Sequence, residues 1–157
     1  MNELEKKAYI FGTIFTISNK LQTLGDGFDK NITTKQWLFI LGVSKFSVPP
    51  TISEVANFIG YSRQNAKRIA SVLNDRGYVK ITKDKNDARA IRIELTPKCA
   101  EYFKKRDKRE IEFLEKIFKN FDYELTNSMY NGLILLEKNI KSIINSEEYA
   151  VDCGDDI

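Results

Sequence analysis

The spacing of apolar residues changes along the chain and predicts helices at both ends with a short β-hairpin between them. From Leu4 to Leu21, apolar residues recur at helical spacing on more than one side. This first helix is therefore expected to be covered on two faces. The turn signal Gly25-Asp26-Gly27 predicts its end.

Three shorter helices are expected between residues 33 and 77. The first two begin with a capping box, in which a Thr and a Gln or Glu three residues later satisfy free N–H groups: Thr33 with Gln36, and Thr51 with Glu54. The first of these two helices carries the apolar residues Trp37, Leu38, Ile40, Leu41 and Val43, and the second places Ile52, Val55, Ala56 and Ile59 on one face.

Pro49-Pro50 follows the first of these helices, and Gly60 ends the second because glycine tolerates the left-handed conformation. After a short turn, Ser62 is placed to cap a third helix, which ends at Gly77. The predicted inward-facing residues of the third helix are Ala66, Ile69, Ala70 and Leu73. Two short helices joined by a glycine-containing turn have the sequence shape of a helix-turn-helix.

The period shortens to two after Gly77, as is typical of half-buried strands. Apolar and polar residues alternate from Val79 to Thr82 and again from Ile91 to Leu95. The segment between these two runs is polar, so the pattern predicts a hairpin with a charged tip.

Helical spacing returns at Thr96-Pro97, where Thr is the expected cap and Pro the first helical residue. This long helix is expected to run to about Phe121. A last helix carries an apolar seam with a period near 3.5, formed by Leu125, Met129, Leu133, Leu136, Ile140 and Ile143. The pattern therefore predicts a mainly α fold with a small β-hairpin wing, a winged helix-turn-helix between long terminal helices.

Charge is divided unevenly along the chain, although the 157 residues sum to only +3. Residues 61–98 hold ten basic and four acidic residues, a net charge of +6. Residues 122–157 hold two basic and eight acidic residues, a net charge of −6. A basic segment of this kind is typical of a region that binds an anion such as nucleic acid, whereas chance clustering of surface charge is the alternative.

Composition argues against catalysis and against export. The chain has no His, which removes the imidazole that many catalytic triads, metal sites and zinc fingers need. Its two Cys residues, Cys99 and Cys153, do not require a disulfide framework. No charge-free run approaches the roughly 20 apolar residues of a membrane span. We expect a cytoplasmic protein that is not an enzyme and has no metal or cofactor.

The helix that begins at Ser62 is the candidate recognition helix. Arg pairs with guanine, Asn and Gln pair with adenine, and Lys and Ser contact phosphates or either base. No acidic residue occurs from Val55 to Asn74, whereas an ordinary solvated helix face mixes both charges. We assign Thr51 and Ser53 to the DNA backbone. The predicted major-groove residues are Ser62, Arg63, Gln64, Asn65, Lys67, Arg68 and Ser71.

The hairpin supplies a second candidate contact, because a basic β-ribbon after a recognition helix is a wing that can place a cation in the minor groove. Asp84 and Asp87 are interpreted as partners that order the loop and aim the arginine; a simple polar hairpin tip is the competing interpretation. The predicted wing residues are Lys83, Lys85, Asp87 and Arg89.

From about residue 4 to residue 145, the sequence resembles the MarR-type winged-helix transcriptional regulators. The resemblance is carried by the run from Thr33 to Trp37, the helix-turn-helix from Thr51, the exit Arg76-Gly77-Tyr78-Val79, the wing pattern Asp84-x-x-Asp87-x-Arg89, and Leu95-Thr96 at the next helix. The resemblance implies a homodimer with interlocking terminal helices. It also implies that Arg89 enters the minor groove and that Asp87 braces it.

Three positions depart from the family pattern. Ala88 stands where a second Arg is common, Lys85 where Pro is common, and Cys99 where Gly is frequent. The first departure weakens the expected wing contacts. Cys99 is interpreted as a small buried hydrophobe rather than a redox sensor.

A basic run and four aromatic residues offer weaker functional signals. The basic run from Lys104 to Arg109 is interpreted as a solvated helix face, since acids and lysines alternate around it at i,i+4. The resemblance implies a possible small-molecule effector, and the aromatic residues that would line its pocket are as readily explained as core. These aromatic residues are Phe11, Phe15, Trp37 and Phe103.

Together these patterns predict a bacterial, sequence-specific double-stranded DNA-binding regulator, a homodimeric repressor that a ligand relieves. The expected segments are 1–31 (N-terminal dimerisation helix), 32–98 (winged helix-turn-helix), 99–145 (C-terminal dimerisation helices) and 146–157 (acidic flexible tail). The expected partners are an inverted-repeat DNA operator and a second copy of the chain, with no membrane. The alternative is an antirepressor-like winged-helix module that binds protein instead of DNA.

Overall fold

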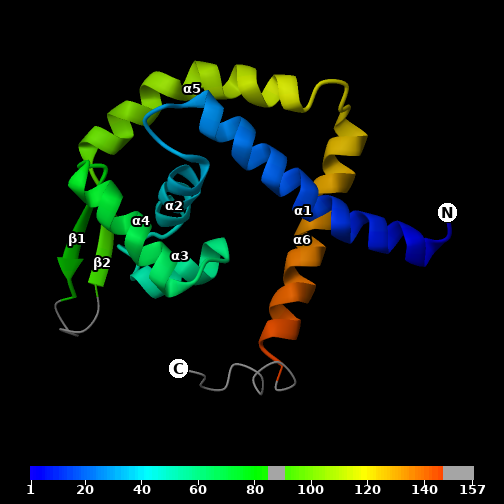
Figure 1. Ribbon diagram of the computed structural model, residues 1–157, viewed down its shortest axis with the longest axis horizontal. Helices are drawn as coiled ribbons and strands as arrows, with labels where there is room; N and C mark the ends of the chain where they lie inside the picture. Colours follow the sequence, from blue (N-terminus) through cyan, green and yellow to red (C-terminus); the bar gives the residue numbers. More distant parts are fainter. Residues whose placement is uncertain (85–90, 147–157) are drawn as a thin grey trace. The chain divides into compact units, whose positions relative to one another are not determined.

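The computed structural model describes residues 1–84 and 91–146, and within these ranges it has six helices and one two-stranded antiparallel sheet (Figure 1). The chain forms two compact units, Met1–Arg106 and Asp107–Ile157. The predicted mainly α fold with a β-hairpin wing is confirmed. The elements are α1 (Glu3–Phe28), α2 (Thr34–Ser44), α3 (Ile52–Ile59), α4 (Arg63–Asp75), β1 (Val79–Lys83), β2 (Ile91–Leu95), α5 (Pro97–Ile117) and α6 (Tyr123–Ile144).

Helices α2 and α3 begin at the predicted capping boxes. The Gln36 N–H donates to Thr33 Oγ1 (3.3 Å), and the Thr33 N–H donates back to Gln36 Oε1 (3.1 Å). Thr51 and Glu54 make the same pair of bonds, at 3.2 and 2.6 Å. Both boxes satisfy N–H groups that the first turn of a helix leaves free, which sets where α2 and α3 start.

The first unit has one apolar core, made by α2, α3, α4, the hairpin and the start of α5. The residues that were predicted to face inward on α4 are all buried. Of the apolar residues singled out on α2 and α3, four are only partly buried: Trp37, Leu38, Leu41 and Ile59. Phe39 is fully buried although the pattern did not single it out. The core residues are Ile32, Phe39, Ile40, Val43, Ile52, Val55, Ala56, Ala66, Ile69, Ala70, Leu73, Tyr78, Val79, Ile93 and Cys99.

The ends of α3 and α4 are formed as the glycine signals predicted. Gly60 lies at φ 72°, in the left-handed region, and its N–H donates to the Ala56 carbonyl. Gly77 lies at φ 73° after α4. The turn from α3 to α4 is short because Ser62 already caps α4, its side chain accepting from the Asn65 N–H at 3.2 Å.

Helix α1 continues through Gly25-Asp26-Gly27 and ends at Phe28, so the predicted end at the glycines is wrong. The cause is packing: a Cβ on Gly25 would collide with the Thr34 hydroxyl. That hydroxyl donates to the Gln22 carbonyl (3.0 Å), and Asp26 accepts from the Thr34 N–H (2.6 Å). The glycine permits the close approach of α1 and α2 instead of ending the helix.

Helix α5 ends at Ile117, four residues before the predicted end near Phe121. Asn120 adopts a left-handed φ of 68°, and the Asp122 side chain accepts from the Leu125 N–H (2.8 Å) to cap α6. The N-cap residue requires an extended backbone, so the chain leaves the helical path before it. The predicted seam residues lie on α6, every side chain of which is exposed.

A buried ion pair ties the end of α1 to α5 within the first unit. Arg106 donates to Asp29 Oδ2 at 2.6 Å, and both side chains are at most 10% exposed. Tyr102 also donates to Asp29, and the Asn31 N–H donates to its other oxygen at 2.8 Å. The guanidinium lies over the ring of Phe103, 5.0 Å from its centroid. The interpretation of residues 104–109 as a uniformly solvated face is therefore wrong at Arg106.

Cys99 lies in the core, as expected of a small hydrophobe. Its side chain is 1% exposed, and burial raises the pKa of the thiol to about 11. The thiol is therefore protonated at neutral pH and unreactive while the core is folded. Cys153 lies outside the described residues. In the part of the chain that the structure describes, no helix is long and apolar enough to cross a bilayer.

We expect Arg106→Met to lower the free energy of unfolding by about 3–5 kcal/mol, because the change leaves the Asp29 carboxylate buried without its cation. Urea denaturation of the full chain measures this. Lys105→Met is the control, because Lys105 forms an exposed pair with Glu101 on the same helix and its loss should cost under about 1 kcal/mol. Equal losses in the two variants would contradict a structural role for the buried pair.

Acid should remove the stabilisation that Asp29 provides. Burial raises the pKa of Asp29, but the hydrogen bonds from Tyr102 and Asn31 and the charge of Arg106 together lower it below the usual value. The contribution is therefore present above the unfolded carboxyl pKa and is lost as pH falls through the lower folded pKa. Asp29→Asn should flatten this part of the stability profile; a parallel acid loss in both proteins would contradict it.

Candidate nucleic-acid interface

Helix α4 has one face in the core and one face in solvent. Ala66, Ile69, Ala70 and Leu73 are buried at helical spacing, and this fixes the rotation of the helix about its axis. The predicted major-groove residues lie on the remaining surface: Asn65 is half-buried, and Ser62, Arg63, Gln64, Lys67, Arg68 and Ser71 are exposed. The structure therefore presents all seven on one helix and its cap.

Two of these residues are linked to each other. The Arg68 guanidinium donates to Asn65 Oδ1 across one helical turn at 3.4 Å, a long and therefore weak hydrogen bond. Ser62 Oγ accepts from the Asn65 N–H, so the serine oxygen is already engaged in capping. The groups that remain available for a partner are mostly donors, which suits phosphate and guanine acceptors.

The residues assigned to the DNA backbone lie at the start of α3. Thr51 and Ser53 are both half-buried. Thr51 Oγ1 accepts from the Glu54 N–H. Hydrogen bonds from the Thr51 N–H and hydroxyl hold the pKa of Glu54 below its usual value, so Glu54 stays ionised beside the cap. Thr51 thus has a structural role as the cap of α3, and its contact with the DNA backbone stays a prediction.

The described part of the hairpin places one predicted wing residue, Lys83, which is exposed at the end of β1. Lys85, Asp87 and Arg89 lie outside the described residues. The strands are in antiparallel register, with Ile81 opposite Ile93 and Thr82 opposite Arg92. The hairpin thus begins directly after α4, as the wing interpretation requires.

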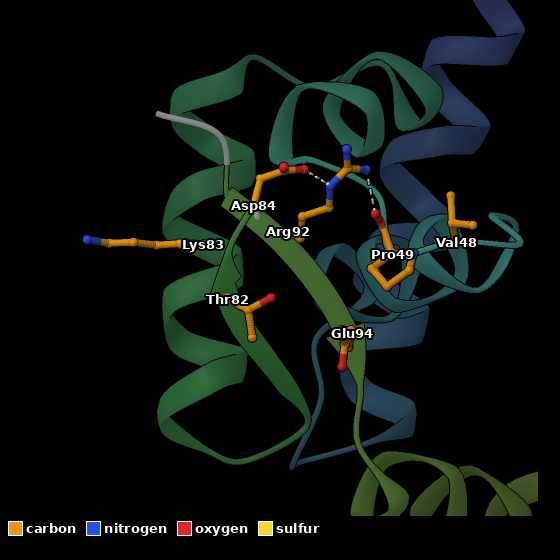
Figure 2. A pocket seen from close by; sticks show the side chains of 7 residues that line it. All are labelled: Val48, Pro49, Thr82, Lys83, Asp84, Arg92 and Glu94. Carbon is orange, nitrogen blue, oxygen red and sulfur yellow. Dashed lines mark hydrogen bonds and ion pairs between the residues drawn. The ribbon is translucent and has the colours of Figure 1, made fainter. Parts of the chain in front are cut away.

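Arg92 is a residue whose role the sequence pattern missed. Figure 2 shows its guanidinium between Asp84 and the carbonyl oxygen of Pro49. It donates to Asp84 and, at 2.8 Å, to Pro49 O, and it lies 3.9 Å from Glu54 Oε2. The hydrogen bond to Asp84 raises the pKa of Arg92 above its ordinary value, so the guanidinium stays charged.

The contacts of Arg92 with Asp84, Pro49 and Glu54 form a clasp. This clasp joins three parts of the first unit: the residue that follows β1, the segment before α3, and α3 itself. A β-bridge between Thr51 and Arg92 continues the contact along the same edge of β2. Asp84, one of the two acids expected to order the loop and aim the arginine, accepts from Arg92; Arg89 lies outside the described residues, so its contact with Asp84 stays a prediction. The hairpin register could have predicted the contact between Asp84 and Arg92. Thr82 lies opposite Arg92, so residues 84 and 92 are diagonal neighbours on one face of the antiparallel ribbon.

The Arg92 contacts lie in a pocket on the hairpin face that carries Thr82, Arg92 and Glu94 (Figure 2). Charged and polar side chains dominate its lining, and the guanidinium of Arg92 crosses it. The lining residues are Val48, Pro49, Thr82, Lys83, Asp84, Arg92 and Glu94.

The four aromatic residues considered for an effector pocket separate into two pairs. Trp37 and Phe103 pack against the core. Phe11 and Phe15 lie edge to face on α1, with ring centroids 5.1 Å apart, and are 67% and 58% exposed. Trp37 and Phe103 are thus accounted for as core, as the simpler interpretation held.

A helix-turn-helix followed by a β-hairpin whose strands pack on the same core defines a winged helix-turn-helix. No family model and no curated protein matches the sequence. Solved structures do match: a MarR transcriptional regulator from Methanosarcina mazei Go1 has a TM-score of 0.78 and 21% identity, over 87% of this chain and 99% of that one.

Two further solved structures are similar. A MarR protein from Peptoclostridium difficile has a TM-score of 0.76 and 21% identity, over 85% of this chain and 88% of that one. FabT from Streptococcus pneumoniae, solved in complex with DNA, has a TM-score of 0.63 and 17% identity, over 87% and 99%. At these identities the likeness establishes the fold. The chain has the MarR-type winged-helix fold that its motifs resemble.

Arg92→Ala should loosen the attachment of the hairpin to the segment before α3. We expect amide hydrogen exchange at Ile93 to become roughly three- to tenfold faster, because a charged donor to Asp84 and Pro49 is lost beside it. Exchange of the full chain, followed by NMR, measures this. Lys80→Ala, an exposed change on the same hairpin, should leave the rate unchanged; an unchanged rate in Arg92→Ala as well would contradict the clasp.

Proposed function

We propose that the chain is a sequence-specific, double-stranded DNA-binding transcriptional regulator. The observation that carries the proposal is the exposed face of α4, on which Arg63, Gln64, Lys67 and Arg68 occur with no acidic residue before Asp75. An α-helix with donors of this kind fits the major groove, where guanine presents two acceptors and adenine pairs with an amide. The similarity to regulators, one of them solved on DNA, supports this choice.

The wing completes the proposed interface. Lys83 is exposed on β1, and Lys85 and Arg89 add two further cations in the sequence of the tip. Arg suits a narrow minor groove because a guanidinium is weakly hydrated. By the family resemblance, Arg89 enters the groove with Asp87 as its brace. Thr51 and Ser53 are proposed to contact phosphates beside the recognition helix.

The terminal helices are proposed to form a homodimer. Helix α6 leaves apolar side chains exposed along its whole length, among them Leu133, Ile134 and Ile140, each between 46% and 48% exposed. In α1, Phe11 and Phe15 are exposed as well. Apolar surface of this extent is rare on a monomer. A two-fold dimer would hold two recognition helices for half-sites about one helical turn apart.

The proposed division of labour follows the predicted segments: 1–31 and 99–145 for dimerisation, and 32–98 for DNA. The proposal further assigns the protein as a repressor that a small-molecule effector relieves, in line with the family resemblance. Binding, and not catalysis, is its proposed activity, since the chain lacks the histidine on which most hydrolytic sites depend.

Base-reading and phosphate-binding residues should respond differently to substitution. Arg63→Ala should weaken binding by about 1–3 kcal/mol and relax specificity at one position, whereas Lys67→Ala should weaken all sequences alike and reduce the salt slope by about one unit. Gel shifts on fragments selected from the source genome, repeated across salt concentrations, measure both. Lys141→Ala, which removes one exposed cation from α6, is the matched control and should change neither quantity.

If the chain gave no sequence-specific gel shift at moderate salt, the DNA-binding proposal would be contradicted. The alternative, a winged-helix module that binds protein, would then be favoured. A shift that does not depend on salt would contradict the phosphate contacts. Arg89→Ala with unchanged affinity would contradict the wing contact alone, because the recognition helix would still account for binding.

Charged substitutions in the seam of α6 should separate the dimer. We expect the wild-type chain to have the mass of two chains in light scattering after gel filtration, and Leu136→Asp/Ile140→Asp to have the mass of one, because two carboxylates would enter an apolar contact. Asn127→Asp/Asn131→Asp is the control, because it adds the same two charges to α6 outside the seam. A wild-type mass of one chain at micromolar concentration would refute the dimer.

A further inference from the structure

The opposed pair Ile81 and Ile93 has backbone N–H groups that point away from the partner strand. In the same register Thr96 lies opposite Tyr78, and its N–H donates to Tyr78 O at 3.1 Å. Hydrogen-bonded and non-hydrogen-bonded pairs alternate along an antiparallel ladder. The Ile81–Ile93 pair, three positions along, is therefore non-hydrogen-bonded, and each N–H faces an outer edge of the hairpin.

Both outward N–H groups are bound by parts of the helix-turn-helix. The Ile81 N–H donates to Asn74 Oδ1 at 3.1 Å, from the last turn of α4. The Ile93 N–H donates to the Pro50 carbonyl at 2.9 Å, from the segment just before α3. The side chains of the same two isoleucines pack in or against the core. The Ile81–Ile93 pair is thus bound at both edges of the hairpin by hydrogen bonds, and on one face by the core.

A two-stranded ribbon is barely stable by itself, so its direction depends on what holds its edges. Arg92 and Pro50 hold β2 to the segment before α3. Asn74 is the corresponding link between α4 and β1. The chain between them is short, with the Tyr78 N–H donating to Leu73 O at 2.9 Å and Gly77 in the left-handed region. The hydrogen bond from the Ile81 N–H to the Asn74 side chain spans this connection and links its two ends directly.

Asparagine at position 74 suits the role of linking α4 to β1. Asn74 is exposed in the last turn of a helix, where Ala, Lys or Gln would favour the helix more. Asn ranks low there because its short amide bonds to nearby backbone groups, and here that amide oxygen accepts from another element. A carboxylate oxygen has the same reach and acceptor capacity, so Asp is the isosteric replacement that keeps the bond.

We propose that Asn74 is a positioning residue that sets the direction of the wing relative to the recognition helix. The proposal rests on the proposed function, in which α4 reads the major groove and the wing lies on the adjacent backbone and minor groove. Asn74 lies at the far end of α4 from the base-reading residues 63–71, so it acts through Ile81 and not by touching DNA. Residues on β1 beyond Ile81, Lys83 above all, depend on it for their alignment.

The first test needs no DNA. In the full-length protein, Asn74→Ala should speed amide exchange at Ile81 about three- to tenfold and change the orientation of β1 relative to α4, measured by NMR exchange and residual dipolar couplings. Asn74→Asp should preserve both. Circular dichroism should show all variants folded, because the position is exposed. Unchanged exchange and orientation in Asn74→Ala would overturn the proposal.

The second test is a double-mutant cycle with Lys83→Ala on a duplex selected by the wild-type chain from random sequences. Asn74→Ala should weaken binding about three- to tenfold and lower the salt slope by about one unit, because Lys83 loses its phosphate. Lys83→Ala should then cost less than about twofold in the Asn74→Ala background but more in the native and Asn74→Asp backgrounds.

The outcomes separate the two proposals. A Lys83→Ala cost that is equal in every background, or absent in the native one, overturns the positioning role in DNA binding. If the wild-type chain selects no duplex, the proposed function fails, and the exchange and orientation measurements still decide whether Asn74 holds the hairpin.

Discussion

The burial of one face of α4 against α2 and α3 is the interaction on which the rest of the first unit depends. Ala66 and Ala70 are small enough to bring the helices close, while Ile69 and Leu73 fill the core between them. Close packing leaves α4 no freedom to rotate. The polar face is therefore held toward solvent by apolar contacts on the opposite side, so core packing orients the face that is proposed to read DNA.

Polar groups then connect elements that the apolar core alone would leave loosely oriented. Arg92 holds β2 to the segment before α3, Asn74 holds β1 to α4, and the buried pair of Asp29 and Arg106 holds the end of α1 to α5. Each link is directional, unlike apolar packing. The proposed base contacts of α4 would depend on such directional links, because a hydrogen bond weakens steeply when its geometry is displaced.

The terminal helices α1 and α6 differ from the core helices because they leave apolar side chains exposed. α1 and α6 expose apolar side chains that would be costly to leave in water, and α6 does so along its length. The same chain thus combines a winged helix-turn-helix with terminal helices whose apolar faces are exposed. The proposed two-fold dimer would cover these faces and would match the symmetry of an inverted-repeat operator.

Local rules decided much of this fold from sequence. Capping boxes, a left-handed glycine at Gly60 and alternation in the hairpin predicted where most elements begin and end, because each acts over a few residues. The outward set on α4 followed from helical spacing. The sequence did not reveal that Gly25 serves packing, that Arg106 is buried or that Asn74 holds the wing. Those roles join residues far apart along the chain or across a turn whose geometry depends on the whole core, so only the tertiary structure decided them.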